Sequence, residues 1–454
     1  LTVGAMAGIS FFIGKKIKDN DDWAVGGRSL PWYVVVGTQY ATAAGGAFLV
    51  AHVGLGYGSG WFPIVYGIFA GIGLLIIAAM ARWLREQGFS SLPDILTKIF
   101  GYNKTLIAIG AIASIIVPFA ASCTQLVAFG KLFSNITGMN TDILIIIFAI
   151  ISVAIVLPAG LKSVAWTDFI LGVFMFVFTV IVSIYALTKA GGWGAIQTTI
   201  PDLASFPSSM GAMGPKMTVY FAITLIAGTI TMQAYYQRVF AVDKVENARK
   251  TIYYSIIALI ACEFFAAILG MSIRVMNPDL TNETATGWFL TIIPPGLLVI
   301  YSGFIVVTIM STVDSLIQSA AINVTRDFYH NIINPDADDK KLMKINRIAC
   351  IVIVAFSLAF SLLWQEALGW LLLGYSYSAA TLLVVVFVGF LLKDKKYLTP
   401  QAGVASMIFG IIGAAVGQYV FDSRLFYPVY GFAFSLVALV IVSLISREKY
   451  YAAK

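Results

Sequence analysis

Residues 304–324, FIVVTIMSTVDSLIQSAAINV, begin as an apolar run and then become rich in hydroxyl groups. Five hydroxyl residues recur at offsets of 0, 3, 4, 7 and 11, which places them on one face of a helix: Thr308, Ser311, Thr312, Ser315 and Ser319. Such a stripe gains nothing by facing lipid, whereas inside a helix bundle it offers oxygen atoms to a small hard cation. Close packing of small hydroxyl residues against neighbouring helices is the competing explanation.

The composition places the chain in a lipid bilayer. Of its 454 residues, 59% are hydrophobic and 11% are charged, which is too little charge for the surface of a soluble protein. The net charge of +7 does not indicate nucleic-acid binding, because the basic residues lie in short loops between apolar runs. The three cysteines, Cys123, Cys262 and Cys350, lie in apolar segments without paired spacing and indicate neither disulfides nor a metal site.

Apolar runs of about 20 residues predict an all-α polytopic membrane protein with about 13 transmembrane helices. The first run, 1–14, is too short for a full span, and we expect the native chain to begin earlier. The other predicted helices lie near 32–56, 61–83, 104–132, 141–159, 163–189, 217–240, 250–274, 291–325, 343–365, 367–392, 400–420 and 427–446.

The basic residues set the expected orientation. If the N-terminus is outside, 24 of the 29 Lys and Arg residues fall in loops on the inner side. Short cytoplasmic loops carry such an excess. We therefore expect a multi-pass protein of the cell (inner) membrane, with its N-terminus outside and its C-terminus in the cytoplasm.

Two of the predicted helices contain small residues that favour an interruption. They are ATAAGG at 41–46, within 32–56, and IAGTIT at 226–231, within 217–240. Interrupted helices at corresponding places in two halves are typical of inverted-repeat transporters, where freed carbonyls line a cavity. A close helix crossing is the alternative. We expect one transporter domain, 1–454, built from a partial first helix (1–14), two five-helix repeats (32–189 and 217–392) and two extra helices (400–446).

Three acidic residues lie within predicted spans, where a charge is costly unless it is partnered or hydrated. They are Asp168, Glu263 and Asp314. Asp168 lies in the first turns of its helix, where a carboxylate is also favoured by the helix dipole. His52 is an isolated histidine and is interpreted as structural.

Four motifs, in order along nearly the whole chain, resemble the sodium:solute symporter family, and most closely its choline and pantothenate branches. They are Gly26-Gly27-Arg28, then GLKSVAWTD at 160–168, then YYQR at 235–238, and last MSTVDS at 310–315 followed by RDFY at 326–329. The resemblance implies a leucine-transporter-like fold with a 5+5 inverted repeat, and Na⁺ as the coupling ion.

The resemblance also implies where sodium binds. The ligands would be the carbonyls of Ala41, Ala44 and Thr308 and the hydroxyls of Ser311 and Thr312. Five oxygen ligands suit Na⁺. Some relatives hold a second sodium, whose ligands here would be Asp168, Asp314 and Ser315, giving both carboxylates a partner.

The expected solute pocket departs from the well-known branches. Aromatic walls suit a quaternary ammonium, but where the choline branch has tryptophans this chain has Ala43 and Met232, with Phe119 as a looser match. Choline is therefore not the expected solute. The residues expected to line the pocket are Ala43, Gly45, Gly46, Phe119, Gln125, Met232 and Gln233. An amino acid, a carboxylate, a vitamin-like acid and a polyamine all stay open.

The sequence therefore predicts a sodium-coupled symporter that imports a small organic solute by alternating access, with sodium, solute and the lipid bilayer as its partners. It does not predict an enzyme, because no nucleophile–base pair or metal cluster is visible. Two alternatives stay open. One is a symporter of the same fold coupled to protons through Asp168, Glu263 or Asp314, and the other is a membrane sensor that does not transport.

Overall fold

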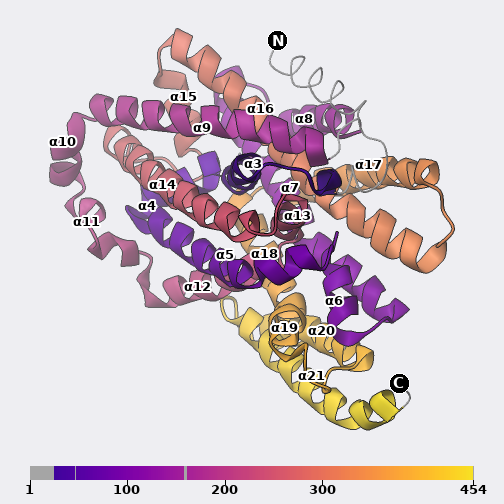
Figure 1. Ribbon diagram of the computed structural model, residues 1–454. Helices are drawn as coiled ribbons and strands as arrows, with labels where there is room; N and C mark the ends of the chain where they lie inside the picture. Colours follow the sequence, from indigo (N-terminus) through magenta and orange to yellow (C-terminus); the bar gives the residue numbers. More distant parts are fainter. Residues whose placement is uncertain (1–24, 46–47, 158–160, 453–454) are drawn as a thin grey trace.

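The computed structural model describes residues 25–45, 48–157 and 161–452, and this part of the chain is built from helices (Figure 1). The first half contains η1 (Gly26–Arg28), α3 (Trp32–Ala44), η2 (Phe48–His52), α4 (Val53–Ser59), α5 (Phe62–Glu86), α6 (Leu92–Phe100), α7 (Lys104–Thr137), α8 (Thr141–Val156) and α9 (Leu161–Lys189). The loop that follows holds α10 (Gly192–Thr199), α11 (Pro201–Ala204) and η3 (Ser208–Gly211).

The second half of the chain also consists mainly of long helices. It contains α12 (Gly214–Thr231), α13 (Gln233–Ala241), α14 (Asn247–Met276), α15 (Ala285–Ile292), α16 (Pro295–Ile322), η4 (Asn323–Ile333), α17 (Asp339–Leu363), α18 (Ala367–Leu383), η5 (Val384–Val388) and α19 (Gly389–Leu392). The chain ends with α20 (Pro400–Ala415), η6 (Val416–Val420) and α21 (Tyr427–Ala452). Figure 1 shows α3 and α13 in the middle of the bundle and α20 and α21 at its edge.

Nine of the described helices are long and apolar enough to cross a membrane, and eleven spans result when each of two bent pairs counts as one. The polytopic all-α prediction is confirmed. The count of 13 stays a prediction, since the partial helix at 1–14 lies outside the described residues. The division of the chain into two five-helix repeats and two extra helices stays a prediction as well. The apolar outer faces of α9 and α21 expose Ile184 and Ile445, among others, as helices in contact with lipid do.

Local sequence signals explain where several helices begin. Ser91, Asn103 and Thr399 each accept a hydrogen bond from a backbone N–H of the following first turn. Such side chains satisfy amide donors that have no partner within the helix. Proline occupies one of the first two positions of α5, α6, α12, α16 and α20, where its missing N–H costs nothing.

The hydroxyl-rich segment lies at the centre of the bundle. Every residue of α16 from 307 to 322 is buried, including all five hydroxyl residues and Asp314. A helix that is buried on every side contacts protein rather than lipid. The prediction that the hydroxyl stripe faces the inside of the bundle is therefore confirmed.

Both interrupted helices are bent. Trp32–Ala43 and Phe48–Ser59 meet at 57°, and Gly214–Thr231 and Gln233–Ala241 meet at 44°. At the second break Met232 leaves the helical region, with φ −78° and ψ 106°. The Tyr236 hydroxyl donates to the carbonyl of Ile230 at 2.7 Å and so satisfies a backbone group close to the break. An interruption at membrane depth is tolerated where such partners exist.

The second half of the first broken helix packs closely against α14. A Cβ atom added at Gly270 would overlap the backbone of Val53 and of Tyr57. Only a glycine lets two helix backbones approach so closely. This contact positions η2 and α4 for the interactions described below.

We therefore expect Gly270→Ala to lower the stability of the protein by about 1–3 kcal/mol, because backbone atoms cannot move aside cheaply. Gly296→Ala is the matched control, since a Cβ atom at Gly296 meets nothing within 4 Å. Thermal unfolding of both variants in detergent measures the difference. Equal midpoints for the two variants would show that α4 does not approach α14 as described.

Candidate functional site

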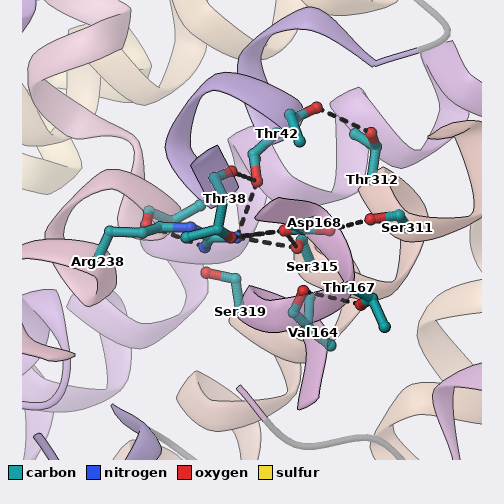
Figure 2. Close-up of polar contacts among 12 residues, drawn as sticks. Thr38, Thr42, Val164, Thr167, Asp168, Arg238, Ser311, Thr312, Ser315 and Ser319 are labelled. Atoms are coloured by element: carbon teal, nitrogen blue, oxygen red, sulfur yellow. Dashed lines mark hydrogen bonds and ion pairs between the residues drawn. The ribbon is translucent and has the colours of Figure 1, made fainter. Parts of the chain in front are cut away.

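A buried carboxylate joins four parts of the chain (Figure 2). Asp168 of α9 is fully buried. Its Oδ2 atom accepts hydrogen bonds from the hydroxyl of Thr38 on α3, at 2.6 Å, and from that of Ser315 on α16, at 3.0 Å. Its Oδ1 atom accepts from the hydroxyl of Ser311, and the guanidinium of Arg238 on α13 lies 3.8 Å from Oδ2. Both broken helices are thus tied to the hydroxyl helix through one charged group.

Arg238 supplies the opposite charge, and it too is fully buried. Its Nη2 atom donates to the hydroxyls of Thr42 at 2.8 Å and of Ser315 at 2.9 Å, and Nη1 donates to the carbonyl of Ala234 at 3.1 Å. A charge without water is stable only when it is paired and hydrogen-bonded. Arg238 and Asp168 therefore form the electrostatic centre of the site, with the hydroxyls of both broken helices and α16 around them.

Three of the predicted sodium ligands lie together beside this centre. The Thr312 hydroxyl lies 3.2 Å from the carbonyl oxygen of Ala41 and 2.9 Å from that of Thr308. A Cβ atom at Gly45 would overlap the Thr312 hydroxyl, so glycine is required where the chain leaves α3. Ala44 is the last residue of α3, next to this point.

The remaining predicted ion ligands are divided between two environments. Ser311 is turned toward Asp168, as is Ser315. Asp314, the residue before Ser315 on α16, is buried, and its Oδ1 atom has no hydrogen-bond partner among the described residues. Two of the predicted second-site ligands, Asp168 and Ser315, are thus brought together, while Asp314 keeps an unoccupied acceptor.

A cavity of about 20 Å³ lies next to the two breaks. This is room for one water molecule. Three of the residues predicted to contact solute, Ala43, Gln125 and Met232, line it. Three tyrosines that were not among the predicted solute residues complete its wall, Tyr66, Tyr235 and Tyr375. Among the described residues that line the cavity, none carries a charged side chain.

The other predicted solute residues lie elsewhere. Phe119 packs edge-on against Phe360 and Trp370. Gln233 is fully buried, and its side-chain oxygen accepts from the backbone N–H of Leu92 at 2.8 Å. Gly45 contacts Thr312 as described, and Gly46 lies outside the described residues.

Arg238 was marked in the sequence only as the last residue of the YYQR motif, without a role of its own. The bend at Met232 directs α13 into the bundle, where Arg238 is 0% exposed. The motif YYQR marked the segment, and a basic residue near the end of an interrupted helix was the signal available.

Known structures share this arrangement of helices. A Na⁺-coupled sialic acid symporter, solved in a substrate-bound outward-open state, superposes with a TM-score of 0.83 at 19% identity, over 98% of this chain and 96% of that one. Mhp1, a nucleobase-cation-symport-1 family transporter in a closed conformation with bromovinylhydantoin bound, gives 0.62 at 14% identity, over 95% and 94%. The fold is therefore that of the secondary transporters with a leucine-transporter-like bundle.

The sodium:solute symporter family model matches residues 23–410, and the chain belongs to this family. The high-affinity proline transporter PutP of Bacillus subtilis (strain 168) is 26% identical over 97% of this chain and 95% of its own length. The sodium/glucose cotransporter of Vibrio parahaemolyticus is 25% identical over 74% and 68%. The predicted family and the predicted fold type are confirmed.

Removing either charge of the central pair leaves the other buried alone. We expect Asp168→Asn and Arg238→Met each to cost about 3–5 kcal/mol of stability, and the double variant to cost clearly less than the sum. Unfolding midpoints in detergent give the coupling between the two residues.

The exposed pair Arg82–Glu86 is the matched control, with its Nε–Oε1 distance of 2.8 Å and side chains that are 72% and 42% exposed. Arg82→Met and Glu86→Gln should each change stability by no more than about 1 kcal/mol. Additive losses at Asp168 and Arg238 would contradict the role given to this pair.

Proposed function

We propose that this protein uses a sodium gradient to import a small solute without net charge by alternating access. The observation that carries the proposal is the group of oxygen atoms that joins the first broken helix to α16. The hydroxyl oxygen of Thr312 lies 3.2 Å from the carbonyl oxygen of Ala41 and 2.9 Å from that of Thr308. Carbonyl and hydroxyl oxygens are the ligands that hard monovalent and divalent cations prefer.

Sodium at this first site would hold the two helices together more strongly than the Thr312 hydroxyl does. A hydroxyl proton is donated to one acceptor at a time, whereas an ion attracts all of the surrounding oxygens at once. The hydroxyl of Ser311 would have to turn away from Asp168 to become a ligand. The carbonyl of Ala44 would complete the set of five. Ion binding is thereby linked to the Asp168–Arg238 centre, since Ser311 donates to Asp168 in the described conformation.

A second sodium would bind at Asp168, Asp314 and Ser315. The unpartnered Oδ1 atom of Asp314 supports such a site, because a buried acceptor without a donor is favourable for a cation. Arg238 already donates to Ser315 at 2.9 Å and lies 3.8 Å from Asp168. We therefore propose that the second ion competes with the guanidinium, so that its binding requires α13 to move.

The lining of the cavity supports the proposed charge of the solute. Tyrosine hydroxyls, Gln125 and apolar side chains surround it, without a charged side chain among the described lining residues. A polyamine or a simple carboxylate would lose its hydration there without gaining a counter-charge. A zwitterion such as an amino acid carries no net charge and can use the hydroxyl, amide and backbone groups of the wall. The proline transporters among the relatives are compatible with this solute class.

The proposed direction of transport follows from the orientation that the basic residues favour, with the N-terminus outside. Sodium and solute would bind from outside and leave on the cytoplasmic side as the repeats rock about the two breaks. An inside-negative membrane potential would then drive the ion inward. In this role the protein acts as a transporter rather than an enzyme.

Sodium should raise the unfolding midpoint of the purified protein, whereas potassium at equal ionic strength should not. At about 100 times the dissociation constant, a bound ion stabilises by about 2.7 kcal/mol. Thr312→Ala removes a ligand and should abolish the shift. Thr251→Ala is the control, because this buried hydroxyl bonds its own helix at Ala248 and should leave the sodium shift unchanged. An equal sodium shift in Thr312→Ala and the wild type would exclude the first site.

Solutes should be distinguished by their net charge. In saturating sodium, we expect a zwitterion such as L-proline to add a further midpoint shift, while spermidine and lactate add none. Gln125→Leu should weaken the response, because a wall group that can hydrogen-bond is lost. A shift with spermidine or lactate alone would contradict a solute without net charge.

A further inference from the structure

A second pair of ionisable side chains lies within the bundle, apart from the site described above. His52 ends the π-helical turn η2, and Glu263 lies in the middle of α14. The Nδ1 atom of His52 and the Oε1 atom of Glu263 are 2.6 Å apart, and the side chains are 1% and 0% exposed. Neither His52 Nε2 nor Glu263 Oε2 has a hydrogen-bond partner among the described residues. Each residue therefore keeps one nitrogen or oxygen atom without a partner.

The surroundings of the pair are aromatic and uncharged. The ring of Tyr66 on α5 lies 4.2 Å from that of His52, measured between centroids, and Phe48 lies 5.6 Å away. On α3, the Tyr40 hydroxyl contacts the thiol of Cys262 at 3.0 Å, beside Glu263. Two further tyrosines are ionisable neighbours, Tyr301 of α16 on the side of Cys262 and Tyr235 of α13 on the side of Tyr66.

Helix α4 also packs against α14, and its tyrosine lies away from the pair. On α4, the Tyr57 hydroxyl donates to the carbonyl of Asn277, at the far end of α14. Tyrosine and cysteine side chains are ordinarily neutral near pH 7. Among the described residues, the ionisable side chain in contact with Glu263 is His52.

The number of protons on the pair differs between a dry and a hydrated state. A site without water disfavours net charge, so the closed pair is neutral overall. It then holds two exchangeable protons, either as histidinium with glutamate or as neutral histidine with glutamic acid. In water, an ordinary histidine becomes neutral above about pH 6.5 and an ordinary glutamate is ionised above about pH 4.3. A hydrated pair near pH 7.5 therefore holds one proton.

We propose that His52 and Glu263 form a proton-binding site, which takes up one proton when the second half of the broken helix (η2 and α4) closes against α14 and releases it when that half moves away and water enters. The hydrogen bond between Nδ1 and Oε1 breaks on opening, and the released proton goes to water. Because Tyr66 separates His52 from the cavity, the site senses closure without contacting solute. The proposal rests on alternating access but not on the sodium site.

The sign of the pH dependence follows from the proton count. The closed state binds one more proton than the open state above about pH 6.5, so raising the pH by one unit favours opening about tenfold. Below that pH, both states of the wild type hold two protons and the dependence ends. The closed state is thus favoured when the solution that reaches the opened pair has a higher proton concentration.

Hydrogen–deuterium exchange of residues 48–59 tests the proposal in the full chain, in nanodiscs and in potassium chloride without sodium. Protection is corrected for the intrinsic exchange rate at each pH, from about 5 to about 8.5. For the wild type we expect protection to be constant up to about pH 6.5 and then to fall about tenfold per unit.

Two substitutions should change this profile in different ways. In His52→Gln only the carboxyl group remains, so protection should start to fall near pH 4.3. It should therefore decrease with pH over the whole range tested. In Glu263→Gln only the imidazole remains, so protection should be constant above about pH 6.5 and fall toward lower pH. A pair that is merely structural would lower protection without moving these onsets.

Asp142→Asn is the control, an exposed carboxylate on α8 that should leave the wild-type profile unchanged. A wild-type profile that is flat above pH 6.5, or one profile shared by the wild type and both variants, would overturn the proposal. If Glu263→Gln does not fold, the onset in His52→Gln against the wild type still decides. Because sodium is absent, failure here is separate from failure of the sodium-dependent midpoint shift.

Discussion

The cost of placing charge where water is scarce determines how the centre of this protein is built. Asp168 and Arg238 are each 0% exposed. Each charge is stable there because the other is present and because hydroxyl groups form hydrogen bonds with both. The hydroxyls come from α3 and α16, while the two charges come from α9 and α13. Four helices are therefore held in register by an electrostatic requirement that apolar packing alone does not impose.

The hydroxyl groups that hold the central pair are also among the proposed sodium ligands. Ser311 donates to Asp168, yet it is one of the proposed ligands of the first sodium, and Ser315 contacts both charges of the central pair. An ion that takes one of these oxygens alters the hydrogen bonding of the pair. The arrangement offers a direct physical route from ion occupancy to the relative positions of the two broken helices.

Sequence reasoning succeeded where the information was local and periodic. The hydroxyl stripe of 308–319 has the repeat of a helix, and the small residues at 41–46 and 226–231 marked both bends. It failed where the information was three-dimensional. Arg238 reaches Thr42, 196 residues away in the chain, only because of the bend at Met232. His52 and Glu263 are 211 residues apart and were interpreted separately.

The tyrosines of the cavity wall were missed for a related reason. Tyr66 and Tyr375 lie on long apolar helices, where one aromatic residue among many carries no periodic signal. The residues predicted to line the pocket included the positions that are tryptophan in the choline branch. The aromatic side chains of this chain instead approach the cavity from α5, α13 and α18.

The small size of the cavity has a thermodynamic consequence. A space of about 20 Å³ does not accept an organic solute, so the described conformation is a competitor of the loaded state rather than its precursor. Solute must select an expanded member of the ensemble, and the measured affinity equals the intrinsic affinity reduced by the population of that member. Changes far from the cavity that loosen the closed bundle would therefore strengthen apparent binding while touching no atom of the solute.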